Sequence, residues 1–248
     1  PHIPANGEVK IKMYYGNPSA SAVSNGDKVF EFFDDFEDGK LTDKWDTLDA
    51  NNGEAFYYSR GYLRADVSGD DENIITEMAI KNTYAIPNDF IIEFDGKVEP
   101  YGSCWQYVGA TGRWIDKNNH YRYYSDCDET GACGNPGDKH VYIMKVTNGV
   151  KTILADTSAG ISWNTWHKFR IISHGSTHEI YIDDMATPKA VAIDTDYSSG
   201  RVGVFTFRGH AYWDNYRVRK YADPEPTLTF SAEYPVVRTA LTLKKSVS

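Results

Sequence analysis

The segment Gly200–Tyr221, GRVGVFTFRGHAYWDNYRVRKY, constrains the fold of this chain more than any other stretch. Its residues predict two strands, Val202–Phe207 and Ala211–Arg219, with a tight break at Arg208-Gly209 between them. Short runs of the same kind recur from Phe30 onward with turn residues between them, and no long run shows apolar residues at helical spacing. The sequence therefore predicts an all-β chain whose antiparallel strands pack as a sandwich.

One carboxylate within this segment needs a partner. Side chains alternate along a strand, so Tyr212, Asp214, Tyr216 and Val218 are expected on one face, which places Asp214 among residues that favour burial. A buried carboxylate is costly unless it is paired, hydrogen-bonded or bound to a metal ion. The acidic stretch Phe30–Gly39, far upstream at the start of the predicted fold, offers acidic and carbonyl oxygens.

The motif FFDDFEDG near the start and the segment Gly200–Tyr221 together resemble the concanavalin A-like lectin/glucanase superfamily. This jelly-roll group includes laminin-G-like domains, lectins and laminarinase-type glucanases. The similarity covers about Val29 to Tyr221 and implies a jelly-roll sandwich of two antiparallel sheets. Because this fold hosts many unrelated activities, the resemblance is specific for the fold and a poor guide to function.

The predicted sandwich comprises residues 28–222 and is flanked by two further segments. Residues 1–27 contain a strand, Glu8–Tyr15, and a linker, and they resemble the end of a domain of unknown function that precedes lectin-like domains in prokaryotic surface proteins. The alternative is that this strand adds to an edge of the sandwich. After a proline-punctuated exit, residues 223–248 form a strand-rich tail with candidate strands at Thr227–Ala232 and Val236–Leu243. The terminal strands could pair with each other within one chain or between chains, which would give self-association.

Composition restricts the partners. The net charge of −9 disfavours nucleic acid, which requires a basic surface. No apolar run reaches the length of a membrane span. The chain begins at Pro1 without methionine, so we expect a mature product or a fragment of a longer protein. Aromatic residues make up 14% of the chain, which suits both strands and surfaces that stack on sugars.

The three cysteines bear on the cellular compartment. Cys127 and Cys133 are close enough in sequence to form a local disulfide, which would leave Cys104 as a thiol. The alternative is three reduced thiols. A disulfide favours an extracellular or cell-surface location.

The carboxylate pattern argues against glucanase catalysis. Laminarinase-type enzymes carry Glu-x-Asp-x-x-Glu, and the stretch Glu93–Glu99 imitates it with Val98 in place of the second glutamate. The resemblance implies that the catalytic strand would fall at His120–Asp126, where the sequence reads HYRYYSD. Glu93 and Asp95 are therefore interpreted as the solvated face of an outer strand. Lyase signatures of this fold are also missing, although His120, Arg122, Tyr124 and His140 include the residue types that a lyase uses.

A sugar-binding face is the preferred interpretation of the polar aromatic residues. Val108 and Ala110 are expected to face the core, so Trp105 and Tyr107 are expected to face outward. In the same way, Val141 and Ile143 are expected to face the core, and His140 and Tyr142 are expected to face outward. On the intervening strand, either Tyr121 and Tyr123 or Arg122 and Tyr124 face outward. Aromatic rings with polar tips stack on sugars, but they also pack the second face of a large sheet. The predicted carbohydrate-binding residues are Trp105, Tyr107, Arg122, Tyr124, His140 and Tyr142.

The resemblance also implies a structural calcium ion at the edge of the sandwich. Glucanases of this fold commonly hold it through one aspartate of the last strand and through main-chain carbonyls from the start of the fold. Asp214 matches the aspartate, and Asp35 and Gly61 match the two carbonyl positions. Calcium favours such oxygen ligands, with water completing the shell.

The sequence thus predicts a non-catalytic carbohydrate-binding or adhesion module of an extracellular or cell-surface protein. Its expected partner is a polysaccharide or other glycan. One alternative is a polysaccharide-cleaving enzyme, either a glycoside hydrolase or a lyase. A further alternative is a structural surface subunit that assembles by strand exchange.

Overall fold

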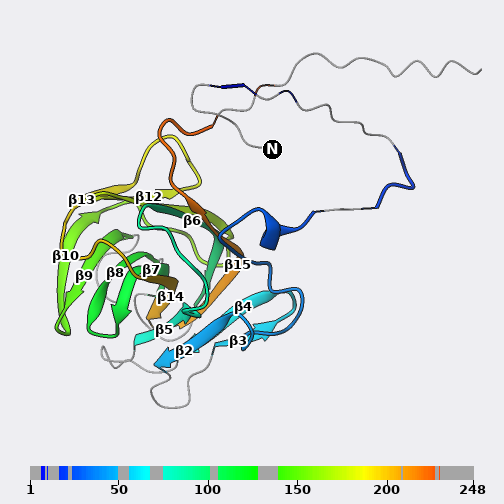
Figure 1. Ribbon diagram of the computed structural model, residues 1–248. Coiled ribbons are helices and arrows are strands. Elements are labelled where there is room, and N and C mark those ends of the chain that lie inside the picture. The colour runs from blue at the N-terminus through cyan, green and yellow to red at the C-terminus, as the bar shows by residue number, and fades with distance from the viewer. Residues whose placement is uncertain are drawn as a thin grey trace, which may run out of the picture.

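The computed structural model describes residues 7–8, 10, 17–21, 24–49, 56–67, 75–100, 106–127, 139–207, 209–226 and 229. These residues form two antiparallel sheets, so the all-β prediction is confirmed (Figure 1). A single turn of 3-10 helix, η1 (Gly26–Lys28), precedes the first strand.

The first sheet has eight strands within the described residues, in the order β13-β12-β11-β6-β15-β4-β3, with β1 also paired to β15. Its central pair, β6 and β15, consists of long strands of 10 and 12 residues. The strands are β1 (Phe32–Asp34), β3 (Phe56–Ser59), β4 (Tyr62–Val67), β6 (Phe90–Glu99), β11 (His167–His174), β12 (Thr177–Ile182), β13 (Ala190–Ile193) and β15 (Gly209–Lys220).

The second sheet has seven strands within the same residues, in the order β10-β9-β8-β7-β14-β5-β2. Strands β7 to β10 follow one another in the sequence, whereas β14 lies between β7 and β5. The strands are β2 (Trp45–Asp49), β5 (Ile75–Ile80), β7 (Gln106–Asp116), β8 (Asn119–Cys127), β9 (Val141–Thr147), β10 (Val150–Thr157) and β14 (Arg201–Phe207).

The core lies between the two sheets and is rich in aromatic side chains. Phe94 and Phe169 stack with ring centroids 4.8 Å apart, and Phe94 also stacks on Tyr216 at 5.8 Å. Trp213 is fully buried, and its indole N–H donates to the Gly109 carbonyl of the opposite sheet at 2.9 Å. Burial of such rings provides most of the driving force for folding, and the indole hydrogen bond fixes how the two sheets align.

Asn148-Gly149, a residue pair that favours a two-residue hairpin, forms such a turn. Asn148 has φ 51° and Gly149 has φ 79°, the left-handed conformations that a two-residue hairpin turn requires. The turn joins β9 to β10, and Val150 pairs with Thr147 across it.

The predicted parity of the last strand is wrong at Asp214. A β-bulge interrupts the pairing of β15 with β6 between Asp214 and Arg217, and Asn215 has φ 53°. The extra residue inverts the alternation of side chains between the two faces. Tyr216 and Val218 therefore lie in the core, whereas Tyr212 and Asp214 are on the outer face of the sheet. Asp214 is consequently only partly buried.

The bulge coincides with a break in the neighbouring strands. Both β1 and β4 pair with the same side of β15, one after the other. Asp34 of β1 lies opposite Tyr216, and Leu63 of β4 lies opposite Trp213. The gap between β1 and β4 therefore falls beside Asp214, which brings the start of the sandwich and its last strand together.

Several sequence predictions concern residues outside the described part of the chain. The strand Glu8–Tyr15 and the tail strands within residues 227–248 belong to this group, so their pairing stays a prediction. Within the described residues, no helix is long and apolar enough to cross a membrane.

Candidate functional site

The outer face of the seven-stranded sheet carries five of the six predicted carbohydrate-binding residues. Tyr121 and Tyr123 are fully buried in the core, which places Arg122 and Tyr124 on the outer face of β8. Tyr107 of β7 and Tyr142 of β9 lie on the same face, and His140 directly precedes β9. The sixth residue, Trp105, lies outside the described residues.

We define the aromatic cluster as Tyr107, Tyr124, Tyr142, His140 and Phe205. Tyr124 is at its centre, with ring centroids 5.3 Å from Tyr107, 5.0 Å from Tyr142 and 5.0 Å from Phe205. The His140 ring stacks on Tyr142 at 5.6 Å. Tyr124 is only 5% exposed, whereas Tyr107, His140 and Tyr142 are half-buried and reach the surface. The sheet thus presents a row of rings whose outer members are accessible.

Two aspartates fix the edge of the aromatic cluster. Asp126, which is 1% exposed, accepts hydrogen bonds from the His140 backbone N–H and from the Tyr142 hydroxyl. Asp156 of β10 binds the Nδ1 atom of His140. Burial raises the pKa of Tyr142, and the charges of Asp126 and Asp156 raise it further, so the phenol is neutral at physiological pH.

A buried ionic group lies beside the aromatic cluster. The Nε atom of Arg122 donates to Glu77 Oε1 at 2.6 Å, and the His120 Nε2 atom lies 3.0 Å from the same oxygen. The Arg122 and Glu77 side chains are 4% and 6% exposed. Burial alone would raise the pKa of Glu77, but the Arg122 charge and His120 together lower it, so Glu77 is ionised. Sequence reasoning missed this role for Glu77.

The two most buried carboxylates of this face, Glu77 and Asp126, are on strands too widely spaced for glycosidase chemistry. Glu77 and Asp126 lie on β5 and β8, three strand positions apart, which corresponds to about 14 Å at about 4.8 Å per strand. Paired glycosidase carboxylates are about 5–5.5 Å apart in retaining enzymes and about 6.5–9.5 Å in inverting enzymes. Both carboxylates are also committed to other side chains.

Glu93 and Asp95 lie on the outer face of the eight-stranded sheet, but their strand, β6, is central in that sheet and is not the outer strand that was predicted. Glu93 is not solvated, however, because Arg170 and Arg217 bind it at 2.8 Å and 3.0 Å and its exposed fraction is 9%. The interpretation of Glu93 as a solvated residue is therefore corrected. Its carboxylate is neutralised by guanidinium groups.

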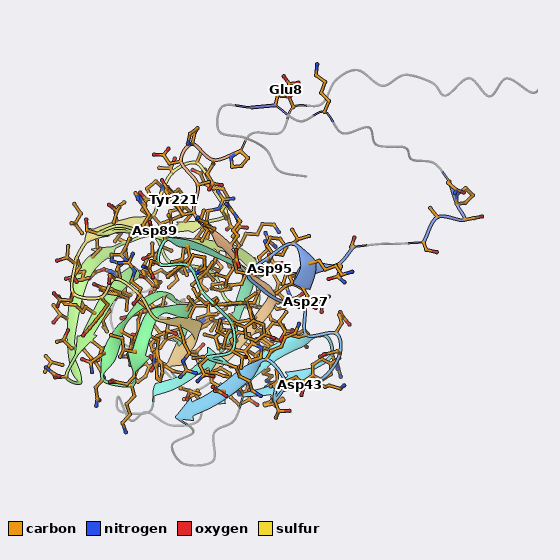
Figure 2. All side chains as sticks on the ribbon, viewed as in Figure 1. Glu8, Asp27, Asp43, Asp89, Asp95 and Tyr221 are labelled. Carbon is orange, nitrogen blue, oxygen red and sulfur yellow. The ribbon has the colours of Figure 1, made fainter. Side chains whose placement is uncertain are left out.

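The predicted calcium residues come together at the gap between β1 and β4. Burial raises the pKa of Asp214 to about 6, and repulsion from Asp95, Glu37 and Asp35 adds to this effect. Among the described residues, its carboxylate accepts one hydrogen bond, from the Asn215 backbone N–H at 2.7 Å. Asp95 is labelled in Figure 2 and accepts from Lys168 at 3.2 Å. This concentration of negative charge suits a bound cation.

The backbone at Gly61 fits the same interpretation. Gly61 has φ 85°, and a Cβ atom there would lie 2.6 Å from Glu37 Oε1. The positive φ disfavours any side chain at this position, and the Glu37 carboxylate approaches the turn before β4. In the part of the chain that the structure describes, no three His, Cys, Asp or Glu side chains form a metal cage by themselves. A calcium ion here would need main-chain carbonyls and water, as the resemblance implies.

Comparisons with known proteins were made by sequence and by structure. A family model with the description "Domain of unknown function (DUF2341)" matches residues 1–48, which include β1 and most of β2. A comparison with curated proteins finds no match.

Solved structures match most of the chain. The carbohydrate-binding module CBM66 from Bacillus subtilis is 20% identical, covers 71% of this chain and 95% of its own, and gives a TM-score of 0.56. The Bacillus licheniformis β-glucanase is 15% identical, with coverages of 77% and 98% and a TM-score of 0.51. The chain has a concanavalin A-like jelly-roll fold. This fold is also that of the VIP36 exoplasmic/lumenal domain in its Ca2+/Man3GlcNAc-bound form, which is 14% identical over 75% of this chain and 88% of that chain, with a TM-score of 0.50.

Proposed function

We propose that this concanavalin A-like sandwich is a non-catalytic carbohydrate-binding or adhesion module that acts outside the cell. The observation that carries this proposal is the aromatic cluster, which continues across adjacent strands on the outer face of the seven-stranded sheet. The similar structures include a carbohydrate-binding module and a lumenal domain bound to a mannose-containing glycan, which supports the same class of ligand.

The exposed fractions divide the cluster into two roles. Tyr107, His140 and Tyr142 reach the surface and are the residues that would stack on sugar rings. Tyr124 and Arg122 are buried beneath them and would hold these rings in place. Rings fixed by neighbours lose little side-chain entropy on binding, which favours affinity.

The enzymatic alternative depends on one feature of the same face. Asp156 binds the His140 imidazole, and His140 stacks on Tyr142, so an imidazole and a phenol lie together at the surface. Such a pair is a candidate for acid–base chemistry in a polysaccharide-cleaving enzyme. Incubation of the protein with glycans found to bind it, followed by reducing-sugar and double-bond absorbance assays, decides between binding and cleavage.

Replacement of Tyr142 by alanine is expected to weaken glycan binding by at least about tenfold, because a central ring is lost from the contact surface. Binding is measured on a glycan array and then by calorimetry with the glycans that bind. Tyr142→Phe, which keeps the ring, is expected to retain most of the affinity.

The matched control is Tyr181→Ala. Tyr181 is a half-buried tyrosine on β12 of the other sheet, where its hydroxyl donates to Glu179 at 2.8 Å. Its removal tests whether any lost surface tyrosine reduces binding. Equal affinities of Tyr142→Ala and the unmodified protein would contradict the proposed face.

We also propose a structural calcium ion at Asp214, with main-chain oxygens of Asp35 and Gly61 as further ligands. The charge concentration around Asp214 and the conformation of Gly61 support this site. The ion would neutralise the carboxylates and hold β1, β4 and β15 together, so its role is stabilisation.

The extracellular setting depends on the predicted disulfide between Cys127 and Cys133. Cys127 is fully buried at the end of β8, whereas Cys133 and Cys104 lie outside the described residues. Alkylation without reduction, followed by mass spectrometry, is expected to label one cysteine of the three. Three labelled cysteines would contradict the disulfide and remove this support for an extracellular location.

A further inference from the structure

A hollow with a volume of about 540 Å³ lies where β7 and β14 meet at one end of the seven-stranded sheet. Its volume is within the range of about 300–1,000 Å³ that is typical of ligand pockets. Its lining includes Asp46, Asn82, Tyr84, Trp114 and Arg201. None of these residues was predicted as a site residue from the sequence.

The hollow offers both donors and acceptors. The Arg201 guanidinium lies 4.5 Å above the Trp114 ring, donates to Asp46 Oδ2 at 2.9 Å and reaches the Ile80 carbonyl at 3.2 Å. The Asp46 and Arg201 side chains are 39% and 21% exposed, and Asn82 is exposed. A carboxylate, an amide and a guanidinium beside aromatic surface are suited to bind sugar hydroxyl groups.

The hollow and the aromatic cluster lie on the same face of the seven-stranded sheet and are connected by buried side chains. The Trp114 and His120 ring centroids are 6.5 Å apart, and His120 contacts Glu77. Arg122 then links Glu77 to Phe205, with its guanidinium 5.0 Å from that ring. The resulting chain of contacts runs through Trp114, His120, Glu77, Arg122, Phe205 and Tyr124.

The charges of this surface indicate what kind of glycan it accepts. Arg122 is paired with Glu77, and Arg201 is paired with Asp46. His140 is bound to Asp156 at the other end. These cations are neutralised by the protein itself, so they leave little positive charge for a uronate or a sulfate.

We propose that the hollow is a second sugar subsite, and that the ligand is an uncharged oligosaccharide that spans both the hollow and the aromatic cluster. This inference rests on the proposed carbohydrate binding and specifies its ligand class. From β9 to β14 the surface extends about 14 Å across three strand spacings, and from Phe205 to Arg201 it extends about 13 Å along four residues. A monosaccharide cannot reach both ends.

The test compares short and long neutral sugars on the full chain by calorimetry. The probes are cellohexaose, laminarihexaose and xylohexaose, their disaccharides, and hexagalacturonate as an acidic hexasaccharide. Asp46→Asn and Asn82→Ala are expected to reduce hexasaccharide affinity by about tenfold and to leave disaccharide affinity unchanged. The matched control is Asp43→Asn, an exposed aspartate that precedes β2, is labelled in Figure 2 and does not line the hollow.

The outcomes separate this inference from the proposed function. If Tyr142→Ala abolishes hexasaccharide binding but Asp46→Asn and Asn82→Ala do not reduce it, the second subsite is wrong and the proposed function stands. Tighter binding of hexagalacturonate than of every neutral hexasaccharide would overturn the uncharged ligand class. If none of the probes binds the unmodified protein, the second subsite for an uncharged oligosaccharide is wrong, and the proposed function fails as well if the glycan array also shows no binding.

Discussion

Replacement of Glu77 by alanine is expected to cost about 3–5 kcal/mol of folding free energy, because it leaves the Arg122 charge buried without its carboxylate. The Arg122 side chain is only 4% exposed, and His120 beside it is fully buried. For a chain of this size, the loss corresponds to a melting temperature lower by roughly 10 °C. Urea denaturation at pH 7 measures the change in free energy.

A double variant separates the net contribution of the ion pair to stability from the cost of leaving one of its charges unpaired. Glu77→Leu combined with Arg122→Met replaces the ions with apolar side chains of similar size, and its stability is expected to be close to that of the original protein. A cost below about 1 kcal/mol for Glu77→Ala would show that water or another anion reaches Arg122.

The pH dependence of the pair follows from the lowered pKa of Glu77. Its carboxylate contributes stability above the ordinary value of 4.5, and this contribution is lost as the pH falls through the lower pKa of the folded state. The free energy of unfolding should therefore fall less steeply with decreasing pH in the double variant than in the original protein.

Removal of calcium is expected to lower the melting temperature by about 5–10 °C at pH 7.5. An ion present at 100 times its dissociation constant stabilises by about 2.7 kcal/mol, and each kcal/mol corresponds to about 2–4 °C for a chain of this size. Scanning calorimetry with calcium and with a chelator measures this difference. Asp214→Asn is expected to abolish it, and Asp43→Asn is the matched control that should keep it.

The calcium effect has a defined pH dependence. Without an ion, the pKa of Asp214 is raised to about 6, so the folded state loses stability as the pH rises from 3.8 towards 6. Calcium binds the ionised carboxylate and reverses this loss, whereas near pH 4 protons compete with it. The chelator should therefore have a large effect at pH 7.5 and little effect at pH 4. If the melting curves with calcium and with chelator are identical at each pH, and elemental analysis finds no bound metal, the ion is ruled out.

The sequence pattern predicted the fold well because its signals are local. Alternating apolar residues located the strands, and the Asn148-Gly149 pair specified a hairpin through its need for positive φ. The outer parity of Tyr107 and Tyr142 also followed locally, from Val108 and Val141 on the core side. These inferences require only period-two alternation within one strand.

The remaining features of the site depend on distant pairings or on irregular backbone. Glu77 and Arg122 are 45 residues apart and meet only because β7 and β14 place β5 near β8. Trp114 belongs to the extension of β7 beyond a bulge, outside the alternation of Val108 and Ala110 from which the outward-facing residues were predicted. The bulge at Asn215 shifted Asp214 outward, and only the tolerance of asparagine for positive φ could have indicated it.

The pairing of β1 with β15 determines how this sandwich would respond to mechanical tension. Phe32 lies opposite Val218, so the chain enters β1 and leaves β15 at the same end of the sheet. A pulling force on residues 31 and 219 would load the three residue pairs of β1 one after another, as in opening a zip, and would detach β1 first. Because β1 leads directly into Asp35, this detachment would also draw Asp35 away from Asp214. A bound cation at that position would then act as a fastener at the point where tension is applied.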